Sequence, residues 1–335
     1  MGLPKLGVRL HGGLAPAECV ALARAAERAG FGALWFAENP FQRGVLPAVT
    51  ACLLQTERLV VGIGVFNPYN RHPTLIAMEM AALDELAPGR TRLGIGSGIG
   101  RQIVRMGLDY SKPLGALRDA ITIVRDLLRG ATVTYRGRVF SVSDVALDFP
   151  PPARAPEILM AAMGDQALRL SGALSDGLMI SNMCPPGYTA RALALMREGA
   201  AKAGRAPPPT VVQYVPCVAR PERAAARAAV KPTIGGMLAA YWAMYAAMPA
   251  VRAAMIADSG IPEPDFLATI ARLEAGAPAT EALDDRFVDA YGIAGTAEDC
   301  LAAAERFGAL GVTDLTLTFV GTQPADDMAY LGAAI

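Results

Sequence analysis

The sequence is poor in the residues that usually build metal centres, disulfide frameworks and polyanion-binding surfaces. It has only two histidines, His11 and His72, which argues against a histidine-rich metal site. Its five cysteines are odd in number and scattered, without a CxxC pair, so free thiols in a reducing cytoplasm fit better than disulfides or zinc. The formal net charge is zero and no basic run stands out, which argues against a nucleic acid or an anionic membrane as partner.

Long hydrophobic runs and several nucleotide or nucleophile motifs are also missing. Apolar stretches are interrupted before membrane-spanning length and the first residues lack a signal-peptide pattern, so we expect a cytoplasmic protein outside the membrane. The glycines of residues 94–100 fall at every second position, which does not give GxGxxG. Ser97 is not flanked as a nucleophile elbow requires. There is no P-loop, and no lysine falls at the end of an expected strand, which argues against a Schiff-base aldolase.

The chain does contain a regular alternation of strand and helix patterns. With 335 residues, 53% of them hydrophobic, it can form one large α/β domain with a sizeable core. Strands are expected at residues 6–10, 33–37, 60–65, 93–95, 157–161, 177–180, 210–218 and 314–320. Helical patterns follow them, which predicts a right-handed parallel (β/α)8 TIM barrel that spans residues 1–335 as a single domain.

Residues 232–291 do not fit this alternation. The stretch is rich in alanine and methionine, contains Tyr241, Trp242 and Tyr245, and is too long to connect two strands directly. We interpret it as a helical insertion after strand seven, bundled at the catalytic mouth, with a dimerisation element as an equal alternative. Residues 132–140 are expected to form a surface hairpin.

In parallel barrels, reactive groups lie at the carboxyl ends of the strands. This rule selects residues 64–69, 96–100 and 161–164 together with His11, Glu38, Asn39, Ser181 and Asn182. The turn at residues 161–164 precedes a helix that starts near Asp165, and free N–H groups at a helix start bind anions. The alternative is a plain helix cap formed by Asp165.

Four segments, in their order and spacing, resemble the luciferase-like flavin and deazaflavin oxidoreductases. They are Gly62-Ile63-Gly64-Val65, Asn67-Pro68-Tyr69 with Arg71-His72-Pro73, Leu83-Asp84-Glu85-Leu86 and Gly94-Ile95-Gly96-Ser97-Gly98. Within this superfamily the chain is most similar to the F420-dependent methylenetetrahydromethanopterin reductases. The resemblance implies hydride transfer with the deazaflavin coenzyme F420, by a homodimer or higher homo-oligomer.

The resemblance also implies a set of cofactor-binding residues. The family carries a non-proline cis peptide that supports the central cofactor ring, here at Gly64-Val65, where the alternative is an ordinary β-bulge. It holds the cofactor phosphate at the turn that corresponds to Ala162, Met163 and Gly164. The full set of inferred cofactor contacts is Asn39, Gly64, Val65, Asn67, Gly96, Ser97, Gly98, Ala161, Ala162, Met163 and Gly164.

Two positions depart from the family pattern. Many members have an acid followed by histidine after strand two, whereas here Glu38 precedes Asn39. Glu38 is therefore the first candidate proton donor and His11 the second. The alternative for Glu38 is an ion pair with an arginine on the barrel rim. Arg9 stands near the place of the reductases' catalytic glutamate; a guanidinium is no general acid at neutral pH, but it binds carboxylates with two hydrogen bonds.

These residues predict an F420-dependent oxidoreductase that transfers a hydride between reduced deazaflavin and an imine or carbonyl substrate. A methylene-tetrahydropterin is the leading substrate class, with Arg9 and Tyr69 expected to bind the substrate. One alternative is an FMN-dependent luciferase-like monooxygenase, and a second is a non-catalytic cofactor-binding barrel. His72 is expected to cap and pack the following helix, and Arg105 either to meet an acidic cofactor tail or to form a solvated face.

Overall fold

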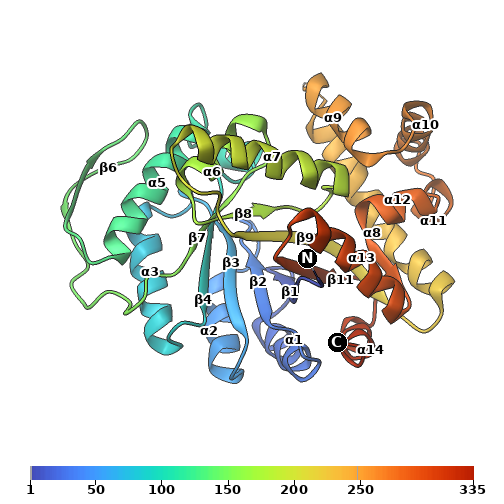
Figure 1. Cartoon of the computed structure of the whole chain (residues 1–335), viewed down its shortest axis with the longest axis horizontal. Coiled ribbons are helices and arrows are strands. Elements are labelled where there is room, and N and C mark those ends of the chain that lie inside the picture. The colour runs from blue at the N-terminus through green and yellow to red at the C-terminus, as the bar shows by residue number, and fades with distance from the viewer. Residues whose placement is uncertain (1, 247) are drawn as a thin grey trace.

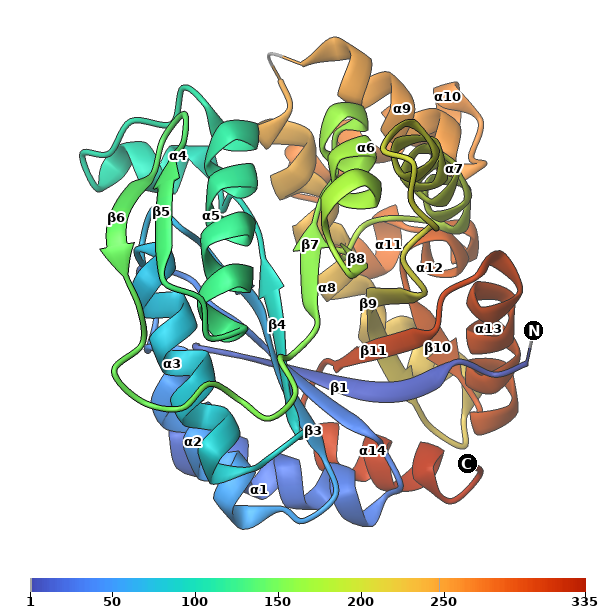
Figure 2. The ribbon, with the colours of Figure 1, turned by 60° about the vertical axis from the view of Figure 1, so that its left-hand side comes forward.

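Eight parallel strands form a closed barrel in a computed structural model that describes residues 2–246 and 248–335. Helices cover the outside of this barrel (Figures 1 and 2). The barrel strands are β1 (Lys5–His11), β2 (Ala33–Ala37), β3 (Val60–Phe66), β4 (Thr91–Ile95), β7 (Ile158–Ala161), β8 (Gly177–Ile180), β9 (Thr210–Ala219) and β11 (Asp314–Phe319). They pair in this order and β11 pairs back onto β1, which confirms the predicted TIM barrel.

Several helices of the barrel start with proline, whose missing N–H costs nothing in the first turn. Proline opens α1, α3, α5, α7 and α14. The helices around the barrel are α1 (Pro16–Arg28), α2 (Val45–Gln55), α3 (Pro73–Leu86), α4 (Gly100–Arg105), α5 (Pro113–Leu128), α6 (Asp165–Leu174), α7 (Pro186–Lys202), α13 (Ala297–Leu310) and α14 (Pro324–Gly332). The short helix α4 was not predicted.

The helical insertion follows β9, as predicted, but it starts earlier than residue 232. Pro232 lies inside α8, and buried Ala226, Val230 and Ile234 form one continuous stripe across it. Proline usually ends a helix, so the sequence pattern placed a boundary there, whereas packing carries the helix through. The segment comprises α8 (Arg223–Met244), α9 (Pro249–Ser259), α10 (Glu263–Glu274), α11 (Ala279–Ala282) and α12 (Asp285–Tyr291), followed by the short strand β10 (Ile293–Gly295), which pairs with β9.

The predicted hairpin is present and longer than expected. Strands β5 (Val133–Arg136) and β6 (Ser141–Val145) pair in antiparallel fashion. Buried Asp119 of α5 holds the connecting turn, because its Oδ2 accepts hydrogen bonds from the backbone of Val139 at 2.7 Å and Phe140 at 3.1 Å. The hairpin and the α8–α12 bundle lie on opposite sides of the molecule (Figures 1 and 2).

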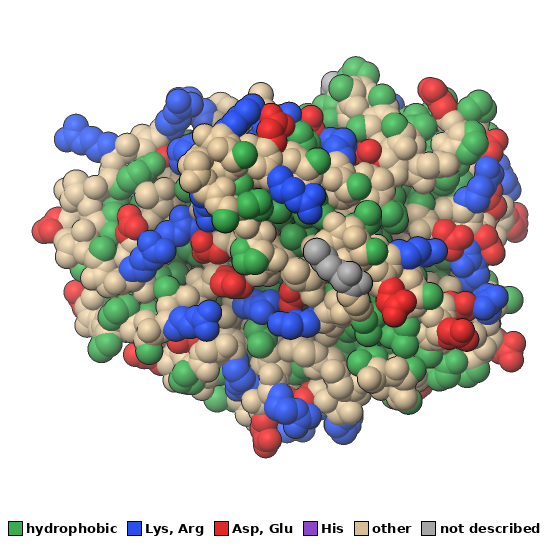
Figure 3. Space-filling view, viewed as in Figure 1, with side chains coloured by type: hydrophobic (Ala, Val, Ile, Leu, Met, Phe, Trp, Pro, Cys, Tyr) green, Lys and Arg blue, Asp and Glu red, His purple; other side chains and the backbone are tan. Residues whose placement is uncertain are grey.

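The barrel interior is filled by its own small cluster, separate from the larger core between strands and helices. Its buried members are Ala33, Trp35, Leu159, Met179, Val212 and Tyr214. This layer is the floor on which anything bound at the carboxyl end of the barrel must rest. No helix in the described part of the chain is long and apolar enough to cross a membrane. Acidic and basic side chains are interspersed on the face shown in Figure 3.

Candidate active site at the carboxyl end of the barrel

The parallel strands bring most of the predicted site residues to one end of the barrel. Several buried polar atoms at this end have no hydrogen-bond partner in the described structure. They are Nε of Arg9, Oε2 of Glu38, Oη of Tyr69 and Oδ1 of Asn182. Because buried polar atoms in proteins are nearly always paired, such a group indicates a place where a ligand supplies the partners.

The β3 bulge forms one wall of this site. The Gly64-Val65 peptide bond is cis, which confirms that prediction, and the register with β4 shifts between Ile63 and Phe66. A side chain at Gly64 would collide with Oη of Tyr214 and come within 2.6 Å of Cε of Met179. Glycine therefore lets the bulge rest directly on the floor of the barrel. Its position under a cofactor ring stays a prediction.

The glycines after β4 lie beside this bulge. A Cβ at Gly96 would approach Cγ2 of Val65 to 2.7 Å, and Gly98 has a left-handed backbone with φ of 74°. Buried Asn67 shapes the adjacent loop after β3, because its Oδ1 accepts a hydrogen bond from the Tyr69 N–H at 2.8 Å. The side chains of Val65, Met179 and Tyr214 therefore pack directly against backbone at Gly64 and Gly96, and only glycine fits there.

Aromatic side chains border this edge. Oη of Tyr110 donates to Oγ of Ser97 at 2.9 Å, and the Tyr110 ring lies 5.3 Å from the ring of Tyr69. The tip of the hairpin adds Phe140, whose ring packs edge-on against Tyr69 and His72. Burial raises the pKa of Tyr69 to about 12, so its hydroxyl is a neutral donor at physiological pH. His72 caps α3, because its Nδ1 accepts from the Thr74 N–H at 3.3 Å, as expected.

Glu38 forms the ion pair that the sequence left as an alternative, but only with one of its oxygens. Nη2 of Arg71 lies 3.2 Å from Oε1 of Glu38, and the carboxylate side chain is 9% exposed. Arg71 is shared, because its Nη1 also contacts Glu79 at 2.5 Å. Burial raises the pKa of Glu38 and Arg71 offsets this in part. The carboxyl group can therefore hold a proton on its unpartnered oxygen.

Asn39 and Arg105 both make contacts with the loop that follows β2. Oδ1 of Asn39 accepts from the Phe41 N–H at 3.1 Å and from Nε2 of Gln102 on α4 at 3.5 Å. The guanidinium of Arg105, also on α4, lies 4.5 Å from the centre of the Phe41 ring. Helix α4 thus covers the β2 loop, and Arg105 lies against an aromatic ring at the rim.

His11 ends β1 as a neutral imidazole. Burial and then the charge of Arg9 lower its pKa, and its Nδ1 accepts a hydrogen bond from the Gly13 N–H at 3.1 Å. Since Nδ1 is an acceptor, the ring proton belongs on Nε2. His11 is therefore a potential proton donor through Nε2 rather than a fixed positive charge.

Arg9 extends from β1 over the barrel floor. Its Cζ lies 5.2 Å from the centre of the Tyr214 ring, and burial lowers its pKa. The residue as a whole is half-buried, whereas its Nε is shielded from solvent. Tyr214, which sequence reasoning missed, is part of a uniformly buried strand, and nothing in that pattern distinguishes it from ordinary core.

The turn after β7 has the form of an anion site. Gly164 is the N-cap of α6 and no side chain caps this helix. Asp165, the capping alternative, instead contacts Arg191 at 2.7 Å. The Ala162 N–H already donates to the Met179 carbonyl at 3.4 Å, so Met163 and Gly164 are the better candidates for binding an anion.

The insertion reaches this mouth. Oη of Tyr245 lies 3.7 Å from Sδ of Met163, and Oη of Tyr188 donates to the Met163 carbonyl at 2.6 Å. Tyr241 lies beside Ser181 and close to Arg9. The end of α8 therefore borders the site, as predicted; the dimerisation alternative stays untested.

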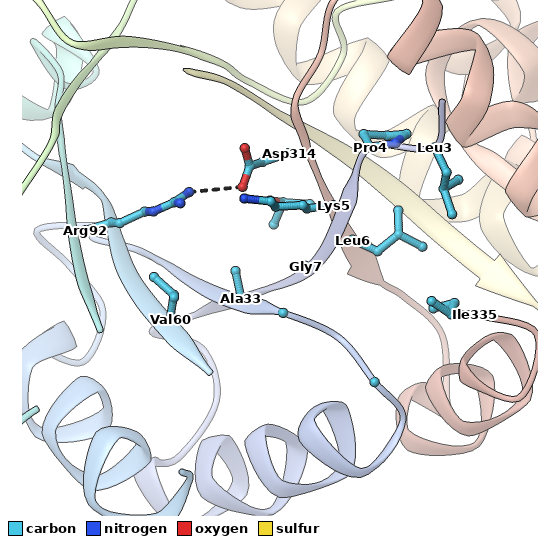
Figure 4. A pocket seen from close by; sticks show the side chains of 13 residues that line it. Leu3, Pro4, Lys5, Leu6, Gly7, Ala33, Val60, Arg92, Asp314 and Ile335 are labelled. Atoms are coloured by element: carbon cyan, nitrogen blue, oxygen red, sulfur yellow. Dashed lines mark hydrogen bonds and ion pairs between the residues drawn. The ribbon is translucent and has the colours of Figure 1, made fainter. Parts of the chain in front are cut away.

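A cavity lies at the opposite, amino-terminal end of the barrel. It measures about 350 Å³ and is lined by the first residues of the strands, including Lys5, Ala33 and Val60. The ion pair of Arg92 and Asp314, 3.0 Å long, spans it (Figure 4). In TIM barrels this amino-terminal face serves stability and the other face serves chemistry, so this cavity is not the candidate site. No group of three or more metal-ligating side chains is found among the described residues.

Comparison with known proteins agrees with this geometry. Residues 3–314 match the model of the luciferase-like monooxygenase family. The chain is 30% identical to 5,10-methylenetetrahydromethanopterin reductase of Methanolobus tindarius over 294 residues, which cover 88% of this chain and 87% of that protein. It is 34% identical to F420-dependent glucose-6-phosphate dehydrogenase of Microbacterium testaceum over 176 residues, about half of each chain (51% and 52%).

A solved structure shares the fold from end to end. The coenzyme F420-dependent tetrahydromethanopterin reductase of Methanopyrus kandleri superposes with a TM-score of 0.85 at 21% identity, covering 99% of this chain and 98% of that one. The family match over nearly the whole barrel, together with the confirmed β3 bulge, settles the classification. The chain belongs to the luciferase-like monooxygenase family of flavin- and deazaflavin-dependent oxidoreductases.

Proposed function

We propose that this protein is an F420-dependent oxidoreductase that transfers a hydride between reduced deazaflavin and an imine or carbonyl carbon. The observation that carries the proposal is the group of buried polar atoms without partners at the barrel mouth, beside the glycine-dependent bulge of β3. The relatives of this chain that use F420 support the choice of cofactor.

The residues fit a flat ring joined to an anionic tail. The β3 bulge would support a ring face, and the uncapped start of α6 would accept a phosphate. The residues that would line the cofactor ring are Val65, Asn67, Ser97 and Gly98. Those that would bind the phosphate end are Ala161, Ala162, Met163 and Gly164. Asn39 would contact the cofactor at the rim of the barrel. When bound, the deazaflavin supplies a carbon that gives or takes a hydride.

The residues of the protein would position the cofactor and the substrate and would transfer a proton. The floor of Trp35, Met179 and Tyr214 excludes water from below. A carbon that accepts a hydride leaves negative charge on its nitrogen or oxygen neighbour, which then needs a proton. Glu38 would deliver it from Oε2, with Nε2 of His11 as the second source. Tyr69 and Arg9 would orient the substrate.

Two other functions remain open to the same test. The family description favours an FMN-dependent monooxygenase, and the replacement of the family's acid and histidine by Arg9 and Asn39 favours a cofactor-binding barrel without catalysis. A methylene-tetrahydropterin remains the leading substrate class. We further propose that the chain acts as one domain in a cytoplasmic homodimer or larger homo-oligomer, a compartment that fits its five buried free thiols.

The experiment is a titration with F420 and with FMN, followed by absorption and fluorescence, with turnover assayed with and without oxygen. We expect F420 to bind more tightly and to be consumed without oxygen in the presence of an imine or carbonyl substrate. Oxygen-dependent turnover with reduced FMN would establish the monooxygenase, and cofactor binding without turnover on any substrate would establish the non-catalytic barrel.

A further inference from the structure

We propose that Arg9, together with Tyr214, forms a binding site for a carboxylate group of the substrate, so that the carbonyl or imine carbon reduced here belongs to an anionic molecule such as a 2-oxo acid. The reaction in this statement depends on the proposed function. The anion site itself depends only on the geometry around Arg9 and is tested separately.

The argument begins with two arginines that point into the same barrel. At the amino-terminal end, Arg92 is neutralised by Asp314 at 3.0 Å (Figure 4). At the carboxyl end, Arg9 has no ion pair with any acidic residue among residues 2–246 and 248–335. Its buried Nε has no hydrogen-bond partner there either. A buried donor is normally paired, so the unpartnered Nε marks Arg9 as a half-buried cation whose partner is not among the described residues.

The groups around Arg9 supply no negative charge at neutral pH. They are the tyrosines Tyr214 and Tyr241 and the neutral imidazole of His11. Burial raises the pKa of both tyrosines, so their hydroxyls stay protonated and act as donors. The Tyr214 ring, 5.2 Å from Cζ of Arg9, supports one face of the guanidinium.

The cofactor phosphate is not the missing partner. The strands follow one another around the barrel as β1, β2, β3, β4, β7, β8, β9 and β11. The inferred phosphate turn follows β7, four strands from β1 in either direction, so it lies across the barrel from Arg9. The β3 bulge lies between them. A ring resting on the bulge with its phosphate at α6 leaves Arg9 on the substrate side.

A carboxylate matches what Arg9 offers. The guanidinium fork makes two parallel hydrogen bonds to a planar carboxylate. Trp35, which is paired with Arg9 across β1 and β2, has a buried Nε1 without a partner, a further donor on the same floor. A carboxylate bound here would hold its neighbouring carbon above the floor, next to the β3 bulge on which the cofactor ring would rest.

The test measures binding of pyruvate, the smallest 2-oxo acid, by ligand-observed NMR at low ionic strength, with acetone as the uncharged analogue and inorganic phosphate as a second anion. The protein is used without cofactor and again with F420. Variants are Arg9→Met, Arg9→Lys and, as a matched control, Arg105→Met, which removes a cation from the rim that lies on Phe41.

We expect wild type to bind pyruvate but not acetone. Arg9→Met should weaken pyruvate binding at least ~10-fold, the lower range for a hydrogen bond to a charged group. Arg9→Lys should keep part of the pyruvate affinity. Arg105→Met should stay within about twofold, because Arg105 is a rim cation whose contact is with Phe41 and not with the barrel floor. The thermal midpoint of Arg9→Met should not fall, because Arg9 makes no ion pair within the described residues, whereas loss of a structural arginine would lower it.

Four results would overturn the inference. They are pyruvate affinity that is equal in wild type and Arg9→Met, absence of pyruvate binding both with and without F420, tighter Arg9-dependent binding of phosphate than of pyruvate, and loss of F420 affinity as the main effect of Arg9→Met. If the protein binds pyruvate through Arg9 but does not bind F420, the carboxylate site stands and the proposed function fails.

Discussion

The guanidinium of Arg71 joins Glu38 at the end of β2 to the loop after β3, with Nη2 donating to Oε1 at 3.2 Å. The same guanidinium contacts Glu79 of α3 and lies 4.7 Å from the centre of the Phe66 ring. One cation is thus divided between two carboxylates. This sharing leaves Glu38 less stabilised as an anion than a dedicated partner would, and burial raises its pKa above the ordinary 4.5.

Glu38→Gln is expected to lower turnover by roughly 10²–10⁴, the range for a positioned acid or base, with F420 affinity within a few fold. A general acid works in its protonated form, so wild-type turnover should fall as pH rises through the raised pKa of Glu38. This fall should be absent in the variant. Steady-state kinetics across pH provide the measurement. Nearly wild-type turnover would remove Glu38 from the catalytic residues and point to His11 or water.

The fold should tolerate this variant. A carboxyl group whose pKa is raised on folding contributes stability at low pH that is lost as pH rises through the folded-state value. The neutral glutamine cannot ionise, so Glu38→Gln should lose less stability than wild type between acidic and neutral pH. Thermal unfolding over that interval checks this, and a variant that unfolds at every pH would show that the Arg71 pair holds the rim together.

Glu79→Gln tests whether Arg71 tunes Glu38. Without the second carboxylate, Arg71 serves Glu38 alone, so the pKa of Glu38 should fall and the decline of turnover should move to lower pH. Combining the change with Glu38→Gln should abolish the shift. An unchanged pH profile in the single variant would mean that Glu79 does not influence the proton donor.

Gly164→Val is expected to weaken F420 binding by about tenfold or more without unfolding the barrel, because loss of a charged phosphate contact costs more than ~1.4 kcal/mol. A Cβ at Gly164 meets nothing within 4 Å, so the new side chain projects into open space at the start of α6. Gly44→Val is the matched control, since Gly44 is the N-cap of α2 and equally open. Equal F420 affinities in both variants, measured by fluorescence titration, would place the phosphate elsewhere.

Gly64→Ala should lower the free energy of unfolding by ~1–3 kcal/mol, the usual cost of overpacking. The added methyl group would meet the Tyr214 hydroxyl and the Met179 methyl group. Tyr214→Phe removes the hydroxyl, so the double variant should recover part of the loss in a denaturant titration. Additive effects of the two changes would show that the bulge does not rest on Tyr214.

The sequence by itself determined the barrel, its strand boundaries and the location of the bulge. Short β-branched runs, prolines at helix starts and glycines at helix ends are local signals, and they suffice because each element is specified within its own dozen residues. The family motifs at Gly64, Gly96 and Gly98 lie on single strands and loops for the same reason. One exception is α8, where packing against β9 and β10 continues the helix through Pro232 although proline usually ends a helix. The short elements α4 and β10 and the helix α13 were also not predicted.

Only the tertiary structure decided which charges are paired. The residues next to Arg92 in the sequence do not predict its ion pair with Asp314, which lies 222 residues later. The residues next to Arg9 likewise do not predict that it lacks such a partner among the described residues. The pairing of Glu38 with Arg71 and the placement of Tyr214 and Tyr241 around Arg9 likewise arise when barrel closure brings distant strands together. Electrostatic energy depends on these through-space distances and on burial, neither of which is encoded in a residue's immediate neighbours.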